Sequence, residues 1–149
     1  MVDNKDLLII NALKDDSKAS VARIAKTVGL PSTTVHHRIQ KLKADGVIRG
    51  YTIRVNQGLL GKKIAAYLAI TVDYKLLKKK KLSQHALAEE LGKLPVVEAV
   101  SIITGISDVI VKLRVKNVEE LNDFVTKKIR NYDGVKTTQT MVILEEVID

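Results

Sequence analysis

Between residues 32 and 40 the sequence concentrates short and medium-sized polar side chains at one end of a predicted helix. The apolar residues Val35, Ile39 and Leu42 recur at i, i+4 and i+7, which predicts the buried stripe of a helix from about residue 31 or 32 to about residue 44. Polar residues at its N-terminal end are Ser32, Thr33, His36, His37 and Gln40. Hydrogen-bonding groups at this end of a helix in the major groove contact base edges, so these five are candidate base readers.

Six residues around this helix are candidates for contact with phosphate: Thr34, Arg38, Lys41, Lys43, Arg49 and Arg54. Such contacts set the affinity for DNA and its salt dependence rather than the sequence preference. Residues 1–61 hold 10 basic and 5 acidic side chains, and the whole chain carries a net charge of +8. That excess favours an anionic partner, such as nucleic acid or a membrane surface. A small helical bundle with a solvated polar face is the alternative interpretation.

Two shorter helices are predicted before this one. The first has Leu7, Ile10 and Leu13 on one stripe. The second begins after the capping residue Ser20 and ends at Gly29, and its apolar stripe consists of Val21, Ile24, Ala25 and Val28. A short helix, a turn with glycine and a second helix form the helix-turn-helix pattern. Residues 47–56 alternate in a way that predicts a strand, and residues 51–61 are expected to connect this part to the next.

Residues 62–149 alternate predicted strands and helices. Strands are expected at 63–74, 96–104, 108–115 and 135–147, and Ser83 and Asn117 are placed to cap the two helices. The β-α-β-β-α-β order predicts a ferredoxin-like sheet, so the whole chain is of the α+β class. Two helices cover one face of such a sheet. The other face, which carries Ala65, Tyr67 and Ala69, needs a partner, and a symmetric second copy is the commonest one.

A basic connector is expected at residues 75–83, and it contains the run Lys78–Lys81. Charge runs are usually solvated loops. A second contact with DNA or RNA is the other interpretation of this run.

Composition and motifs do not favour catalysis. The chain has no cysteine, which excludes disulfides, iron–sulfur clusters, cysteine-ligated zinc and thiol chemistry. His36 and His37 diverge by about 100° on a helix, and His85 stands near the start of another, so no metal site or cofactor is expected. The sequence lacks the dinucleotide-binding, phosphate-loop, zinc-protease and nucleophile-elbow motifs. We therefore expect no enzyme.

The N-terminal residues lack the pattern of a signal peptide, and no stretch approaches the roughly 18 apolar residues of a membrane span. The expectation is a soluble cytoplasmic protein with no membrane partner.

Residues 29–51, GLPSTTVHHRIQKLKADGVIRGY, resemble the helix-turn-helix signature of the Lrp/AsnC (feast/famine) transcription regulators. Residues 2–13 are similar to the opening helix of that family and residues 16–20 to its next loop. The resemblance implies a winged-helix-like DNA-binding domain, followed by a RAM/ACT-like domain for oligomerisation and effector binding. The family usually has serine where this chain has Pro31, so Ser32 is expected to cap the third helix instead.

Thr104-Gly105-Ile106-Ser107-Asp108 is similar to the Gly-x-x-Asp turn with which family members bind amino acids. In that interpretation Gly105 lets a ligand approach the backbone and Asp108 pairs with an α-amino group. Ser107, Thr138 and Thr140 are further candidates to line the site, together with Thr104. The alternative is a plain hairpin turn.

These observations predict a dimer-based, sequence-specific DNA-binding regulator that responds to an amino acid or a related metabolite. Residues 1–50 would bind DNA, 51–61 connect, and 62–149 oligomerise and bind the effector; dimer, tetramer and octamer stay open. One alternative is an architectural protein that compacts double-stranded DNA without sequence preference. The other is a metabolite-sensing module that acts on a protein partner.

Overall fold

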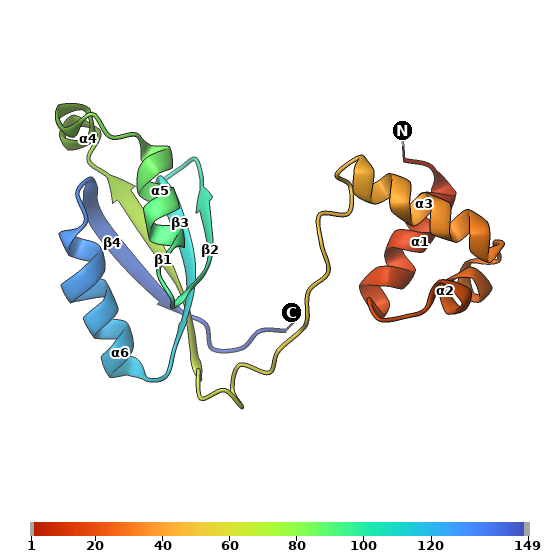
Figure 1. Ribbon diagram of the computed structural model, residues 1–149. Helices are drawn as coiled ribbons and strands as arrows, with labels where there is room; N and C mark the ends of the chain where they lie inside the picture. The colour runs from red at the N-terminus through yellow and green to blue at the C-terminus, as the bar shows by residue number, and fades with distance from the viewer. Residues whose placement is uncertain (1, 148–149) are drawn as a thin grey trace. The chain divides into compact units, whose positions relative to one another are not determined.

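The computed structural model describes residues 2–147, and the chain forms two compact units that divide between Val55 and Asn56 (Figure 1). The N-terminal unit consists of the helices α1 (Asn4–Asp15), α2 (Val21–Val28) and α3 (Ser32–Ala44). Among residues 2–147, no helix combines the length and the apolar character that crossing a membrane requires.

Local hydrogen bonds fix where the first two helices begin and end. Asp3 and Asp6 form a capping box: the Asp6 N–H donates to the Asp3 carboxylate at 2.8 Å, and the Asp3 N–H donates to the Asp6 carboxylate at 3.0 Å. The Ser20 hydroxyl accepts from the Arg23 N–H at 3.2 Å, which confirms the predicted cap of α2. Gly29 ends α2 with a left-handed φ of 68°, also as predicted.

The core of the N-terminal unit corrects the predicted phase of α1. Its buried members are Ile9, Leu13, Ile24, Ala25, Val35 and Ile39, which confirms the stripes of α2 and α3. Leu7, however, is half exposed, and Ile9 is buried instead of Leu7. Asp6 of α1 faces Arg38 of α3. Residues 6, 9 and 13 therefore form the buried stripe of α1, and Ile10 lies at the edge of that stripe.

Helix α3 begins at Ser32 with Pro31 in the cap position and no side-chain cap. The expectation that Ser32 is the cap is therefore wrong. Proline fits here because its fixed φ of about −65° suits the start of a helix. The N–H groups at a helix start have no carbonyl partner within the helix, so the N–H that proline lacks costs no helical hydrogen bond.

Residues 47–56 form no strand, contrary to prediction, although their backbone runs extended after α3. A strand exists only when its N–H and C=O groups pair with a neighbouring strand, and residues 2–55 contain none. The alternating apolar side chains of the segment are consequently exposed, and Ile53 is 72% accessible.

The C-terminal unit is a four-stranded antiparallel sheet in the order β2-β3-β1-β4 (Figure 1). Its strands are β1 (Ile64–Val72), β2 (Val97–Ile102), β3 (Val109–Val115) and β4 (Val135–Val142). The main covering helices are α5 (Gln84–Gly92) and α6 (Val118–Asp123), and α6 continues as a π-helical turn Phe124–Lys128 and a 3₁₀ turn Ile129–Asn131. The predicted β-α-β-β-α-β order is confirmed, although β4 ends at Val142 rather than residue 147.

One face of this sheet carries the core. Leu68 and Ile70 of β1 and Val111 of β3 are fully buried, and Leu91 of α5 and Ile129 pack on them. The caps predicted for the two helices are present, because the Ser83 hydroxyl accepts from the Ala86 N–H at 3.0 Å and the Asn117 side chain from the Glu120 N–H at 2.8 Å.

The predicted connector at residues 75–83 contains a helix, α4 (Tyr74–Lys80), between β1 and α5. The Asp73 side chain caps it, and Leu77 is buried against Gly134 at the start of β4. The lysine run therefore lies at the end of a helix, which corrects the connector prediction.

Candidate nucleic-acid interface and ligand-binding turn

Helix α3 separates its apolar and polar residues as the sequence predicts. Val35, Ile39 and Leu42 are buried, whereas the five candidate base readers Ser32, Thr33, His36, His37 and Gln40 are all exposed. The rings of His36 and His37 meet edge to face with their centroids 6.0 Å apart. Hydrogen-bonding side chains thus extend from the N-terminal half of an anchored helix, which is the arrangement that reads base edges in the major groove.

Arg38 links α3 to the start of α1 through ion pairs that the sequence did not predict, and its contact with phosphate stays a prediction. Its Nη1 lies 2.8 Å from an oxygen of Asp3 and 2.8 Å from an oxygen of Asp6. The pKa of Arg38 is raised mainly by its hydrogen bond to Asp6 and next by its hydrogen bond to Asp3. The pKa of Asp3 is lowered mainly by the hydrogen bond that its carboxylate accepts from the Asp6 N–H, and next by the hydrogen bond from Arg38. The guanidinium is therefore already committed to two carboxylates.

The remaining phosphate candidates occupy the surface around α3. Lys41 and Lys43 are exposed in its last turns, and the Lys43 Nζ lies 4.8 Å from the centre of the Tyr51 ring. Arg49 is exposed beyond the turn that follows α3, and Thr34 is half-buried on the helix. These positions stay candidates for phosphate contact.

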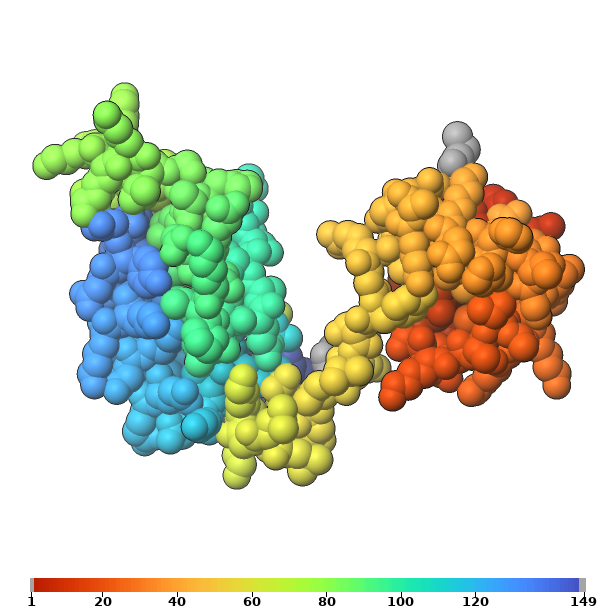
Figure 2. All heavy atoms as spheres, viewed as in Figure 1, coloured from red at the N-terminus to blue at the C-terminus, as the bar shows by residue number. Residues whose placement is uncertain are grey.

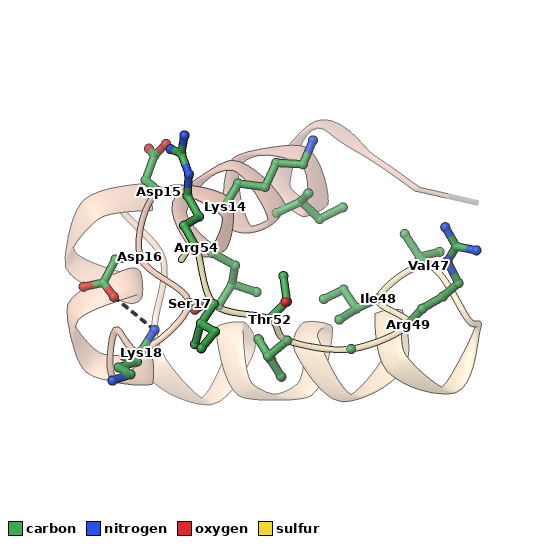
Figure 3. Close-up of a pocket in the computed structure, with 15 residues that line it drawn as sticks. Lys14, Asp15, Asp16, Ser17, Lys18, Val47, Ile48, Arg49, Thr52 and Arg54 are labelled. Atoms are coloured by element: carbon green, nitrogen blue, oxygen red, sulfur yellow. Dashed lines mark hydrogen bonds between the residues drawn. The ribbon is translucent and has the colours of Figure 1, made fainter. Parts of the chain in front are cut away.

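A hollow of about 650 Å³ lies between the α1–α2 loop and the extended segment after α3 (Figure 3). Ile48 and Thr52 line it from that segment, and Ser17 lines it from the loop. Figure 3 shows Arg49 at one end of the segment and Arg54 at the other, where Arg54 extends toward Asp15.

In the C-terminal unit the candidate ligand turn joins β2 to β3. Gly105 has a φ of 123°, a conformation that L side chains rarely adopt, so glycine is needed for the backbone path, as the hairpin-turn interpretation expects. Thr104 and Gly105 are exposed, and Ser107 is half-buried. The turn thus offers open backbone and hydroxyl groups.

Asp108 anchors the turn to the rest of the unit. One carboxylate oxygen accepts from the Val72 N–H at 2.8 Å, and the other accepts from the Tyr74 hydroxyl at 2.9 Å. The Gln84 amide donates to the Asp108 carbonyl at 3.0 Å. These partners were not predicted: the ligand interpretation paired the carboxylate with an α-amino group, and the hairpin-turn interpretation gave it hydrogen bonds within the turn.

Thr138 and Thr140 do not join the turn within one protomer. They pair with Ile70 and Leu68 along β4, and β1 lies between β4 and β3, the strand that follows the turn. The Thr138 hydroxyl instead accepts from Arg130 Nε at 3.3 Å.

Two features of the C-terminal unit escaped sequence reasoning. Ile106 at the tip of the turn is 98% exposed. The sequence could have indicated this, because an apolar residue stands where turns are usually polar. Four charged residues also meet on the face that the helices leave open: Lys112, Arg114, Glu98 and Glu146. Arg114 Nη2 lies 2.6 Å and Lys112 Nζ 2.7 Å from Glu146. In the sequence, only the alternation of side chains along the strands indicated that this face exists.

Within residues 2–147 no group of three or more histidine, aspartate and glutamate side chains could hold a metal ion. What the structure does bring together is a helix-turn-helix unit with an exposed polar face on its third helix and a ferredoxin-like unit with a glycine-containing turn.

Comparison with known proteins gives the same two parts. Residues 2–49 match the winged helix-turn-helix DNA-binding family, and residues 66–149 match the Lrp/AsnC ligand binding domain. The transcriptional regulator FL11 of Pyrococcus furiosus is 38% identical over 145 residues, which are 97% of this chain and 91% of that protein. This combination defines a DNA-binding transcription regulator with a ligand-binding domain.

Solved structures agree along nearly the whole chain. AsnC of E. coli superposes with a TM-score of 0.85 at 26% identity, covering 100% of this chain and 96% of AsnC. LrpC of B. subtilis superposes with a TM-score of 0.83 at 27% identity, covering 99% and 98%. A Neisseria meningitidis regulator in complex with L-Met shares the fold, with a TM-score of 0.90 at 17% identity and coverage of 100% and 94%. The chain belongs to the Lrp/AsnC family of transcription regulators.

Proposed function

We propose that the protein is a sequence-specific regulator that binds DNA as a dimer or a higher assembly of dimers and responds to an amino acid or a related metabolite. The observation that carries the proposal is the exposed polar face of α3 above a buried apolar stripe. Thr33, His37 and Gln40 would contact base edges, and Lys41, Lys43 and Arg49 would contact phosphates.

Two surfaces support self-association. The helices leave one sheet face open, and Tyr67 lies on it with Met141 beside it. In the N-terminal unit the extended segment exposes Tyr51 and Ile53 and has no strand to pair with. A second copy would cover such faces symmetrically and would present two reading helices about one turn of DNA apart.

The β2–β3 turn is the proposed effector site. Backbone groups at Gly105 and the hydroxyls of Thr104 and Ser107 are available to a small polar ligand, and Asp108 holds the turn in shape. An effector with an α-amino group could reach the outer lone pairs of that carboxylate. A regulator that shares this fold is known as a complex with L-Met, which supports the choice of ligand class.

Selection of bound duplexes from a random pool at about 0.15 M salt tests the proposal, since that salt screens most non-specific attraction. We expect an enriched palindromic motif whose half-sites lie roughly 10 base pairs apart. Retention of DNA without any enriched motif would instead support an architectural protein. Absence of retention would favour a metabolite module that acts on a protein.

The selected duplex then serves to test the effector. The twenty amino acids are screened for a shift in DNA affinity, and Gly105→Val is the test variant, because a branched side chain obstructs the approach to the backbone and strains the φ of 123°. We expect a shift with at least one amino acid in the wild-type protein and a loss of that shift in the variant.

A further inference from the structure

Helix α4 concentrates the positive charge of the C-terminal unit. Five lysines occur between residues 75 and 81, whereas the rest of residues 62–149 contains 10 basic and 12 acidic side chains. Figure 2 shows this segment, in light green, with long side chains that project from the surface of the unit. The net positive charge of the C-terminal unit is therefore concentrated in residues 75–81.

This charge sits on a fixed element. The Asp73 side chain accepts from the Leu76 N–H at 2.9 Å, and the Asp73 N–H donates to the Gly134 carbonyl at 2.8 Å. Leu77 is 2% exposed and packs on Gly134 so closely that any side chain at position 134 would collide with it. A pre-ordered helix loses less conformational entropy on binding than a flexible lysine loop does.

Four of the five amines are available. Lys80 pairs with Asp133, whereas Lys75, Lys78, Lys79 and Lys81 are exposed and have no carboxylate within 4.0 Å among residues 2–147. The neighbouring acidic groups are engaged, because Asp73 caps the helix and Asp108 binds Val72 and Tyr74. Helix α4 and its C-cap residue Lys81 thus present four cations with little local compensation.

We propose that α4 is a second DNA-binding surface, which contacts phosphates of the duplex whose bases α3 reads. The proposal rests on DNA binding by the N-terminal unit, because that binding brings a polyanion to the protein. Lysine binds phosphate as a point charge, so α4 would add affinity and salt dependence without adding sequence preference.

The test removes the four amines and spares Lys80. The variant Lys75→Gln/Lys78→Gln/Lys79→Gln/Lys81→Gln keeps a good helix former at the three positions inside α4 and an uncharged side chain of comparable length at the cap position 81. The matched control is Lys63→Gln/Lys116→Gln/Lys128→Gln/Lys136→Gln, which removes the same charge from exposed lysines of the same unit that also have no carboxylate partner. Circular dichroism and thermal melts check that both variants fold.

Affinity for the selected duplex with long flanks is measured between low and moderate salt. Each lost phosphate contact reduces the slope of log K against log salt by about 0.9, so four contacts reduce it by about 3.6 per protomer. We expect a reduction of about 2 or more for the α4 variant, little change for the control, and recovery when the four positions are arginine. Equal slopes for the α4 variant and the control would overturn the proposal and leave the proposed function intact.

A second measurement locates α4 on the DNA. Because the chain has no cysteine, Lys79→Cys carries the only thiol and takes an iron–EDTA cleavage reagent. We expect strand cleavage at defined positions outside the half-sites, and none from Lys128→Cys. The absence of cleavage above that control would contradict the proposal.

Other polyanions give distinct outcomes. If phosphatidylserine vesicles bind the wild-type protein and the α4 variant loses that binding while its DNA slope matches the control, α4 is a membrane contact and the proposal is wrong. Failure of the wild-type protein to bind any duplex would overturn the proposed function and this proposal together.

Discussion

Arg38 and Asp6 join two helices at positions 32 residues apart in the sequence, with Nη1 of Arg38 2.8 Å from Oδ1 of Asp6. The Asp6 side chain is largely buried, and its second oxygen completes the capping box of α1. The first turn of α1 and the middle of the reading helix are therefore fixed to each other by one guanidinium.

Replacement of Arg38 is expected to act through stability. In Arg38→Ala the carboxylate of Asp6 is left largely buried without its cation, so the melting temperature of the N-terminal unit should fall by several degrees. Lys41→Ala, on the exposed side of the same helix, should leave the melt unchanged and weaken DNA binding. Differential scanning calorimetry and duplex titration separate the two effects. A normal melt for Arg38→Ala would contradict the structural role.

The reading face and the stripe beneath it should respond differently to truncation. Ile39→Ala empties part of the N-terminal core and is expected to cost about 2–5 kcal/mol of folding free energy. Thr33→Ala and His37→Ala change exposed side chains, so the melt should stay within about 0.5 kcal/mol while discrimination between the selected motif and its variants falls. Unchanged discrimination in both surface variants would exclude this reading face.

Tyr74 is expected to ionise at a higher pH than is ordinary for a tyrosine. Its hydrogen bond to Asp108 raises its pKa above the ordinary value of 10.0, since ionisation would break the bond and bring two anions together. A raised folded pKa means that the bond contributes stability below pH 10 and that the contribution is lost as the pH rises through the raised pKa. Absorbance titration of tyrosinate should show one late group, which Tyr74→Phe removes.

The charged cluster on the open sheet face predicts an acid transition. Hydrogen bonds from Arg114 and then Lys112 lower the pKa of Glu146 below its ordinary value of 4.5. Because the folded pKa is the lower one, the contribution to stability is present above pH 4.5 and is lost as the pH falls through the lowered pKa. Glu146→Gln should melt earlier than wild type at neutral pH. The two melting curves should converge in acid, and a constant gap would be evidence against the linkage.

Gly134→Ala should loosen α4. A Cβ at this position would lie 2.3 Å from Cδ2 of Leu77, and the φ of 94° is strained for any L side chain. We expect a loss of about 1–3 kcal/mol in the C-terminal unit. The same substitution in a Leu77→Ala background should cost less, because the collision is gone and only the backbone strain remains. Additive losses in this double-mutant cycle would show that the contact is unimportant.

Local patterns were sufficient for much of the fold and for the exposed polar face of α3. The stripe of α3, the cap at Ser20, the left-handed Gly29 and the strand order each depend on residues within a few positions of one another. The phase of α1 could not be read because four apolar residues follow one another from Leu7 to Ile10, and the distant pair of Asp6 with Arg38 decides it.

The other features that the sequence did not predict also depend on contacts between residues far apart in the chain. Helix α4 has few apolar residues to mark it, and its anchor Gly134 lies 57 positions after Leu77. The anchoring of Asp108 by Tyr74 likewise joins elements 34 residues apart. At residues 47–56 the alternation was real, but alternation alone does not supply the neighbouring strand that pairing requires.

The two units bury separate cores, one formed by residues between 9 and 39 and the other by residues between 66 and 129. A substitution in one core therefore removes no side chain from the other. If the proposed function holds, changes in α3 after gene duplication would alter the operator, and changes in the β2–β3 turn would alter the signal, one at a time. Recombination near residue 56 would exchange whole recognition and sensing modules between paralogues without having to rebuild either interior.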